Sequence, residues 1–251
     1  MDNQKEEELC KKRLLELARS SYYKEYPTYS SFLNLNEQTV FEEIKTKLPS
    51  VHYFMWGGYE LAERKMLCFD VSEIEPSNFP FRLIKIEPSH PKFAENLTHR
   101  DYLGSLLGLG IERSVVGDIL IQDKMAYVYV EDTMSQYVVD NLEMVKRTNV
   151  KCSYTDENFV FKQNFKEIIG TVQSVRLDSV LSTAFHSSRN QMLPLISNGK
   201  VYVNGRQVVS NSYKLKEKDI ISVRGMGKFV YEEEQTMTKK GKIKIVMKRY
   251  V

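Results

Sequence analysis

The chain has 251 residues, of which 42% are hydrophobic and 27% charged, and its formal net charge is +3. These values are ordinary for a globular protein, and the length allows two or three small domains. No apolar run approaches the roughly 20 residues that cross a bilayer. The charged opening MDNQKEEELCKKR also lacks the apolar core of a secretion signal. We therefore expect a cytoplasmic protein with no membrane partner.

The three cysteines, Cys10, Cys68 and Cys152, are far apart and odd in number. This pattern favours reduced thiols over a disulfide framework. The four histidines are scattered and no CxxC pair occurs, which argues against a zinc site. The sequence therefore predicts no metal site and no cofactor.

Residues 1–75 are expected to form a small N-terminal α/β domain. An apolar face recurs at helical spacing between Leu9 and Ala18, and a second helix is predicted at Asn36–Leu48, before Pro49. A strand is expected at Val51–Trp56 and a further helix at Tyr59–Lys65. The aromatic residues of this block alternate with Lys and Arg. They either stack on bases or pack in a core or partner interface, and the second interpretation is favoured.

Residues 76–160 show the order strand, helix, strand, strand, helix, strand. This is the order of a ferredoxin-like plait, which RNA-recognition domains share, although their aromatic signature is not evident here. Tyr127 and Tyr129 share one face of a predicted strand, so they form either a base-stacking platform or part of a core or dimer surface. The predicted strands are Phe81–Glu87, Asp118–Gln122, Met125–Val130 and Val150–Tyr154, a tight turn is expected at Asp123–Lys124, and the predicted helices are His99–Leu109 and Met134–Arg147.

Residues 155–173 connect this plait to the last part of the chain. Phe159, Phe161, Phe165 and the pair Ile168–Ile169 predict a packed strand instead of a loose tether.

The most informative segment is Arg176–Gly227. Two short amphipathic segments are followed by a glycine turn, a Val-Tyr-Val strand and the Asn204–Gly205 pair, which is typical of tight hairpins. A second alternating strand, Asp219–Val223, leads into the basic, glycine-rich RGMGK.

This order resembles the alpha-L RNA-binding motif of the fourth small-subunit ribosomal protein, tyrosyl-tRNA synthetases and pseudouridine synthases. The matching anchors are RLD, SR, I-x-x-G-x-V-x-V-N-G and D-x-I-x-V-R-G, all in order over about fifty residues. We expect an alpha-L RNA-binding domain at 174–235. A basic hairpin, pairing Phe229–Glu233 with the alternating strand around Ile245, is expected to extend it to 251.

Charge and capping agree with RNA binding by this segment. Ser187 and Ser188 can cap the second helix, which places Arg189 beside free backbone N–H groups that favour phosphate. From Ser174 to Val251 there are fifteen Lys or Arg against six Asp or Glu. The modest net charge of the whole chain therefore conceals a basic C-terminal third, as polyanion binding requires.

The segments GGYELAERK and HRDYLGSLLGLGIERSVVGDIL, together with the alpha-L domain, resemble the YlmH family of bacterial RNA-binding proteins. The resemblance covers essentially the whole chain. It implies an α+β protein that binds ribosomal RNA on the large ribosomal subunit, in ribosome quality control that stabilises a stranded peptidyl-tRNA. Whether tRNA is itself a direct partner stays open. The implied RNA contacts are Arg176, Asp178, Ser188, Arg189, Lys200, Asn204, Arg224 and Lys228.

The sequence leaves open the role of three polar residues in the middle segment and the possibility of an enzymatic activity. Arg100, Asp101 and Arg113 either contact RNA or form a buried ion pair that orients a helix, and the structural role is favoured. The main alternative function is an rRNA-modifying enzyme of the methyltransferase or pseudouridine synthase type. Asp178, however, lies inside the binding module, and the glycines of Gly104–Gly110 fall at a predicted helix, where a phosphate loop is not expected. A third class is an interaction protein that RNA only localises.

Overall fold

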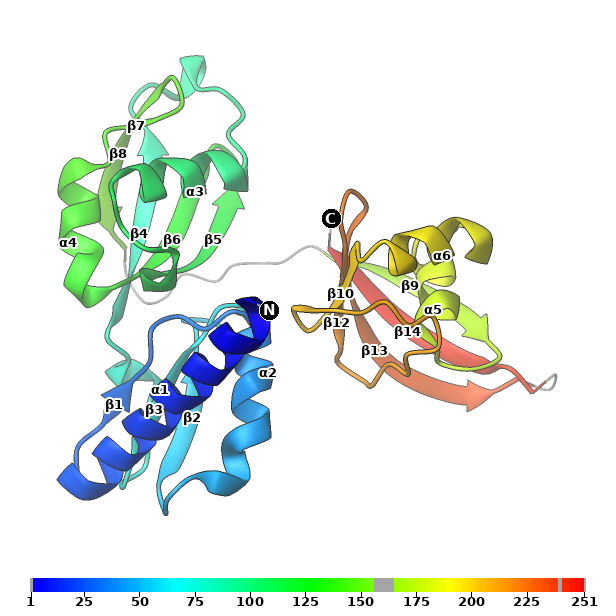
Figure 1. Ribbon diagram of the computed structural model, residues 1–251. Helices are drawn as coiled ribbons and strands as arrows, with labels where there is room; N and C mark the ends of the chain where they lie inside the picture. The colour runs from blue at the N-terminus through cyan, green and yellow to red at the C-terminus, as the bar shows by residue number, and fades with distance from the viewer. Residues whose placement is uncertain (1, 156–164, 239–240, 251) are drawn as a thin grey trace. The chain divides into compact units, whose positions relative to one another are not determined.

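The computed structural model describes residues 2–155, 165–238 and 241–250, which belong to two compact units, Met1–Phe161 and Lys162–Val251 (Figure 1). Each unit contains helices packed on antiparallel sheets, so the predicted α+β class is confirmed. No helix among the described residues is long and apolar enough to cross a membrane. The predicted domain boundaries at residues 75 and 160 stay a prediction.

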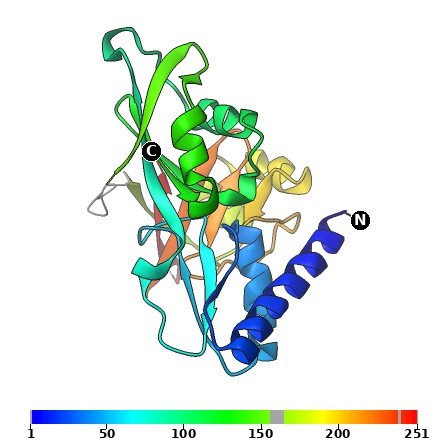
Figure 2. The same cartoon turned by 90° about the vertical axis from the view of Figure 1, so that its left-hand side faces the viewer.

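The first unit begins with two helices on a small sheet (Figures 1 and 2). Asn34 caps the second helix by accepting hydrogen bonds from the N–H groups of Asn36 and Glu37, and Glu37 accepts one from Asn34 in return. This capping box satisfies the first free N–H groups. The elements are α1 (Asp2–Lys24), α2 (Leu35–Ile44), a 3-10 turn at Lys45–Lys47, and the sheet β1 (Thr28–Tyr29), β3 (Met66–Asp70), β2 (His52–Trp56), in that order.

The helix predicted at Tyr59–Lys65 is wrong, because this segment is a series of turns. The N–H groups of Glu63 and Arg64, which a helix would use internally, donate instead to the carboxylate of Asp118, at 2.7 and 3.1 Å. A side chain more than fifty residues away therefore overrides the local helical pattern.

The second part of the first unit has the predicted strand and helix order, with strand order β5-β6-β4-β8-β7 and every neighbouring pair antiparallel. The predicted tight turn is confirmed, since Asp123 adopts φ +56° between β5 and β6. The elements are β4 (Phe81–Pro88), α3 (His99–Gly108), β5 (Val116–Gln122), β6 (Met125–Glu131), α4 (Asp132–Asn141), β7 (Met144–Val145) and β8 (Thr148–Tyr154), with 3-10 turns at Pro76–Asn78, Pro91–Phe93 and Arg113–Val115.

The predicted helix Met134–Arg147 extends too far at its C-terminal end. The helix α4 ends at Asn141, and Lys146 adopts φ +51° in a turn that pairs β7 with the start of β8. Val145 is fully buried there. An apolar residue that suggested a longer helix therefore belongs to the core through a strand instead.

Both faces of the five-stranded sheet contribute residues to hydrophobic cores. The helices α3 and α4 pack on one face. On the other face, Leu83, Leu120 and Tyr129 pack against Phe32 and Met66 of the N-terminal part. Tyr129 is only 5% exposed and its hydroxyl donates to the carbonyl of Gly58 at 3.2 Å. The interpretation of Tyr129 as a base-stacking residue is therefore wrong, and Tyr127 is packed against the same cluster.

One polar cluster connects the two parts of this unit. The Asp118 carboxylate accepts from the Tyr59 hydroxyl at 2.8 Å and from two backbone N–H groups of the turn segment. The guanidinium of Arg64 donates to the carbonyls of Phe32 and Val116. Burial lowers the pKa of Arg64 and, together with Asp118, raises the pKa of Tyr59. The carboxylate of Asp118 thus fixes the turn segment onto β5.

Removing this carboxylate should loosen the first unit. Asp118→Ala leaves a hydroxyl and two N–H groups without their acceptor, and we expect the free energy of unfolding to fall by about 2–4 kcal/mol. Thermal and urea denaturation measure this loss. Asp118→Asn, which keeps an acceptor oxygen, should lose less, and equal stability of the alanine variant and the natural protein would contradict the assigned role.

A pair of glycine substitutions tests the contact between the two parts independently. Gly58 has φ +95°, and a Cβ there would lie 2.0 Å from the ring of Tyr129, so Gly58→Ala should destabilise the protein by at least about 2 kcal/mol. Gly104 is exposed in α3, and a Cβ added to it would meet no atom of the described chain within 4 Å. Gly104→Ala should therefore stabilise by about 0.5–1 kcal/mol. Melting temperatures that shift in the same direction would refute this assignment.

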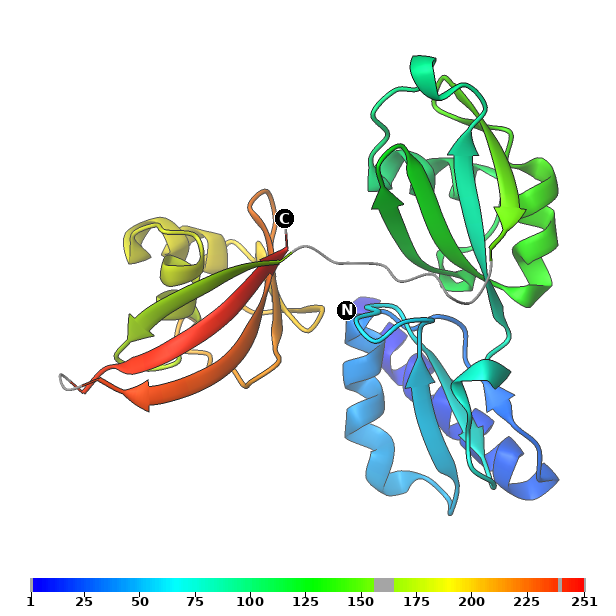
Figure 3. The ribbon, with the colours of Figure 1, turned by 180° about the vertical axis from the view of Figure 1, so that it is seen from behind.

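The second unit is a six-stranded antiparallel sheet with the order β11-β10-β12-β13-β14-β9 (Figure 3). The helices α5 and α6 contribute to a single core with one face of this sheet. Asn204 and Gly205 adopt φ +48° and +77°, so the predicted tight turn is confirmed. The elements are β9 (Phe165–Val172), α5 (Leu177–Ala184), α6 (Arg189–Ser197), β10 (Val201–Val203), β11 (Arg206–Gln207), β12 (Ile220–Val223), β13 (Gly227–Met237) and β14 (Ile243–Tyr250).

The predicted C-terminal hairpin is confirmed as β13 paired with β14. Strand β14 also pairs along its length with β9. The packed strand that was predicted for Phe165 and Ile168–Ile169 is therefore confirmed, and it belongs to the second unit. Phe159 and Phe161, on which that prediction also depended, lie outside the described residues.

Candidate nucleic-acid interface

The first helix of the second unit begins with an oriented arginine. Arg176 occupies the N-cap position of α5, and its Nε lies 3.3 Å from Oδ1 of Asp178. The side chain of Asp178 is 9% exposed and that of Arg176 is 43% exposed. The buried carboxylate therefore orients the exposed guanidinium and offers little surface of its own to RNA.

The second helix carries the best-defined cation of this unit. Ser188 caps α6, accepting from the Gln191 N–H at 3.3 Å, whereas the Ser187 hydroxyl donates to the Phe185 carbonyl. Arg189 is the first helical residue and is exposed. Its Nη2 donates to the buried Ser179 hydroxyl at 2.7 Å. Arg189 is thus held at a helix start, where backbone N–H groups attract phosphate.

The remaining predicted cations lie along the strands. The Arg224 N–H donates to the Lys200 carbonyl at 2.9 Å, so these two exposed residues are neighbours. The Arg224 guanidinium lies over the Tyr202 ring, 5.1 Å from its centroid. The Lys228 Nζ lies 4.3 Å from the Tyr250 ring centroid.

Asn204 has a structural role in the turn. Its side-chain N–H donates to Asp219 at 2.8 Å, and its Oδ1 accepts from the Ile220 N–H at 2.9 Å. Because both ends of this amide are engaged within the fold, Asn204 supports the hairpin that carries its neighbours.

The predicted cations do not all share one surface. Val201, Val203, Ile221 and Val223 belong to the core beneath the helices. Side chains alternate along a strand, so Tyr202 and its neighbours in the register face the other side of the sheet. The structure therefore separates a helix-side group, Arg176, Ser188 and Arg189, from a sheet-side group, Lys200, Arg224 and Lys228.

Several participating residues were not predicted. The alternation that buries Val201 and Val203 could have identified Tyr202 from the sequence. The contact of Ser179 with Arg189 could not be found this way, because it joins two helices. Arg249 was also missed, and its guanidinium lies 4.9 Å from the Phe185 ring centroid and donates to the Met226 carbonyl.

Two of the three polar residues singled out around α3 have structural roles. Asp101 accepts from the N–H and hydroxyl of Thr98 and pairs with Lys146 at 2.9 Å, which lowers its pKa to about 2. The Arg113 guanidinium donates to the carbonyls of Val116 and Gly117, and burial lowers its pKa to about 10. The favoured structural role is right for both, although their partners differ from the predicted buried ion pair.

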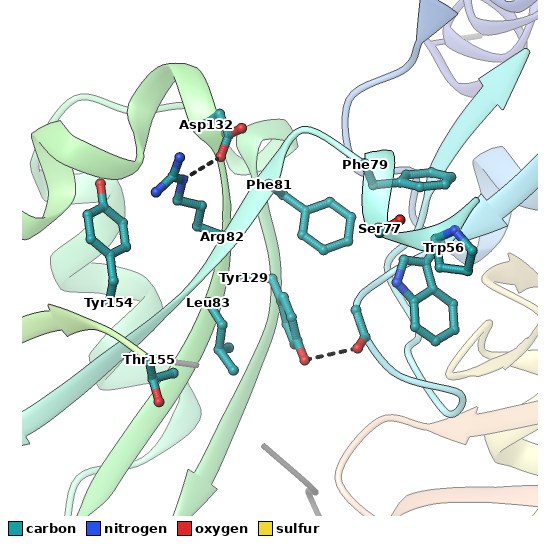
Figure 4. Close-up of a pocket in the computed structure, with 12 residues that line it drawn as sticks. Trp56, Ser77, Phe79, Phe81, Arg82, Leu83, Tyr129, Asp132, Tyr154 and Thr155 are labelled. Atoms are coloured by element: carbon teal, nitrogen blue, oxygen red, sulfur yellow. Dashed lines mark hydrogen bonds and ion pairs between the residues drawn. The ribbon is translucent and has the colours of Figure 1, made fainter. Parts of the chain in front are cut away.

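The first unit contains a cleft of about 770 Å³ (Figure 4). Aromatic rings form much of its wall, and its charged groups are the Arg82–Asp132 pair, 3.2 Å apart. The Arg82 guanidinium also lies 5.3 Å from the Tyr154 ring centroid. The cleft is thus largely neutral. Its lining residues are Trp56, Gly58, Pro76, Ser77, Phe79, Phe81, Arg82, Leu83, Tyr129, Asp132, Tyr154 and Thr155.

Burial disfavours the thiolate form of all three cysteines. Burial raises the pKa of Cys10 and Cys68 to about 11 and that of Cys152 to about 12, so all three thiols are protonated at neutral pH. Among the described residues, no group of three His, Cys, Asp or Glu side chains could hold a metal ion.

Comparison with known families matches both parts of this arrangement. Residues 75–158 match the putative RNA-binding domain in YlmH, and residues 175–221 match the S4 domain. The chain is therefore of the class of RNA-binding proteins with an S4 domain. More particularly, it belongs to the YlmH family, in which these two domains occur together.

One relative extends over most of the chain. The ribosome-associated protein quality control protein P2 of Bacillus subtilis (strain 168) is 29% identical over 223 residues, covering 88% of this chain and 86% of that protein. A tyrosine–tRNA ligase of Staphylococcus epidermidis is 29% identical over 93 residues, 36% of this chain and 20% of that protein. The solved structure of the cell division protein ylmH from Streptococcus pneumoniae shares the fold. It has a TM-score of 0.50 and 24% identity, over 60% of this chain and 92% of that chain.

The internal hydrogen bonds of Asn204 predict that this residue stabilises the fold and does not contact RNA. Asn204→Ala removes two hydrogen bonds and places alanine at positive φ, so the second unit should lose about 2–3 kcal/mol. Arg189→Ala removes one hydrogen bond, to the buried Ser179 hydroxyl, and should cost less, about 1 kcal/mol. Denaturation followed by circular dichroism measures both. Unchanged stability of Asn204→Ala, with weakened RNA binding, would make this residue a contact instead.

Proposed function

We propose that this protein is a non-catalytic RNA-binding factor that docks on structured ribosomal RNA of the large ribosomal subunit. We further propose that it acts in ribosome-associated quality control, where it stabilises a stranded peptidyl-tRNA. The Bacillus subtilis relative, a ribosome-associated quality control protein that this chain matches over 86% of its length, supports the assignment. The observation that carries it is Arg189, held exposed at the start of α6 by the buried Ser179.

The proposed contact depends on shape and backbone charge. The guanidinium of Arg189 and the free N–H groups at the start of α6 would together bind a phosphate. Arg176 would bind a second phosphate, because the buried carboxylate of Asp178 fixes its direction. Phosphate contacts of this kind set position and orientation, whereas base edges set sequence. A folded RNA of the right shape is thus the favoured ligand.

The wider architecture is proposed on the same basis. The strand order of the second part of the first unit supports a ferredoxin-like plait at 76–160, between an N-terminal α/β domain at 1–75 and an alpha-L domain at 174–235 that a basic hairpin extends to 251. The protonated thiols and the engagement of Asp178 with Arg176 support a non-catalytic role. We place the protein in the cytoplasm, where its ribosomal ligand is found.

Co-sedimentation with ribosomal subunits across a salt series tests this proposal. We expect the natural protein in the large-subunit fraction and release at high salt. Arg189→Ala should bind at least about tenfold more weakly than the natural protein, because a charge-assisted contact is lost. The steepness of the plot of log affinity against log salt concentration should also fall by about one.

Arg19→Ala is the matched control. Arg19 is an exposed arginine of α1 outside both matched domains, so this variant removes the same charge and should sediment as the natural protein does. Equal binding of Arg189→Ala and Arg19→Ala would exclude the proposed surface. Absence of the natural protein from every subunit fraction would exclude the ribosomal ligand.

A further inference from the structure

A row of side chains crosses the helix-free face of the second sheet. Tyr202 on β10 lies opposite Ser222 on β12, and Ser222 lies opposite Lys228 on β13. Tyr250 on β14 lies opposite Phe165 on β9. The Lys228 Nζ, 4.3 Å from the Tyr250 ring centroid, connects the two halves. We call these five residues the cross-strand row.

The core residues show that this row faces away from the helices. In the strands β10, β12 and β13, the residues next to the row are Val201, Val203, Val223 and Phe229, and all belong to the core with α5 and α6. All five members of the row are themselves partly exposed. Figure 3 shows β9, β14 and β13 side by side on this sheet. The row is therefore a surface distinct from the helix-side group that contains Arg189.

The row carries three aromatic rings, and a cation lies over two of them. Tyr202 carries the Arg224 guanidinium over its ring at 5.1 Å, and Tyr250 carries the Lys228 ammonium. Phe165 packs against Tyr250 edge to face, with ring centroids 5.0 Å apart, so these two rings fix each other's orientation. Neighbouring strands lie about 4.8 Å apart, so the row is about 19 Å long, enough for two or three extended nucleotides.

Among the described residues, acidic side chains of this face lie beside Lys248. Glu232, farther along β13, pairs with Lys218 and lies 3.2 Å from Lys248. These contacts lower the pKa of Glu232. Glu167 lies opposite Lys248 in the register. The carboxylates are thus gathered around Lys248, two residues along β14 from Tyr250.

We propose that the cross-strand row binds a short unpaired segment of RNA, whose bases stack on Tyr202 and Tyr250 while Arg224 and Lys228 bind the adjoining phosphates. A base that takes a ring face displaces the cation from it, and the flexible cation then reaches a phosphate. This mode combines stacking with backbone charge and tolerates any base. The inference rests on the proposed function only in that the ligand is RNA. The surface is the helix-free sheet face instead of the helix-side group, and the RNA it binds is unpaired instead of folded.

Binding of a labelled single-stranded oligouridine and of a blunt RNA hairpin to the full chain tests this inference. Tyr202→Ala and Tyr250→Ala should each bind the single strand about 5- to 150-fold more weakly, as loss of one stacked base predicts. Both should keep the affinity of the natural protein for the hairpin. The variants Tyr202→Phe and Tyr250→Phe keep the ring and should keep single-strand binding within about twofold.

Ile169→Ala is the control on the same face. Ile169 is 53% exposed and lies opposite Val246, outside the row, so its replacement should leave single-strand affinity unchanged. Circular dichroism checks that each variant is folded, and Tyr202 and Tyr250 lie on different strands, so one variant suffices if the other fails to fold.

The outcomes separate this inference from the proposed function. The inference would be overturned if both folded alanine variants bound the single strand as tightly as the natural protein does. It would also be overturned if Ile169→Ala lost the same affinity. Neither result would affect the proposed function, which depends on subunit binding through Arg189. Loss of single-strand binding in the tyrosine variants, with no subunit binding at any salt, would support the row and exclude the ribosomal ligand. Dimerisation that the tyrosine variants abolish, without any single-strand binding, would make the row a self-association surface and overturn the inference.

Discussion

The contact between the two sheets of the first unit limits how much of the surface of this unit is open. In many domains with this strand order, the sheet face opposite the helices is open and stacks bases. Here Leu83, Leu120 and Tyr129 on that face are buried against Phe32 and Met66. The carboxylate of Asp118 then fixes the intervening turns by three hydrogen bonds. Because this face is used for internal packing, the exposed surfaces of the second unit are the better-supported sites for RNA.

The second unit divides its sheet differently. Its helices cover only one face of the sheet, so the fold leaves a helix side and a sheet side that present different chemistry. The helix side offers a guanidinium beside free N–H groups, which suits a phosphate of folded RNA. The sheet side offers rings beneath cations, which suits unpaired bases. The two faces therefore offer the different contacts that the two proposals require.

Much of this arrangement could be predicted from the sequence, for physical reasons that differ between elements. The Asn204–Gly205 turn and the strands β10 and β12 follow from local backbone preferences and alternation, and they were predicted correctly. The turns at Tyr59–Lys65 were not, because Asp118, remote in sequence, supplies the acceptor for their N–H groups. Local pattern carries no information on such a partner.

The same division holds for the predicted RNA contacts. Arg189 was placed at the helix start because capping serines are a local signal, and Ser188 does cap α6. The separation of Arg189 from Arg224 and Lys228 could not be predicted, since it depends on which sheet face the helices cover.

The position of β14 between β13 and β9 has a consequence for how the second unit folds. Residues of β9 and β14 that pair with each other are more than seventy residues apart in the chain. Contacts this distant raise the contact order and slow folding, because loop closure must precede their stabilisation. Until β14 arrives, β9 has no neighbour in the sheet, and its exposed Ile169 lies on an open edge prone to pairing with other chains. The cross-strand row, which needs Tyr250 of β14 and Phe165 of β9, is therefore complete only after this long-range pairing has formed.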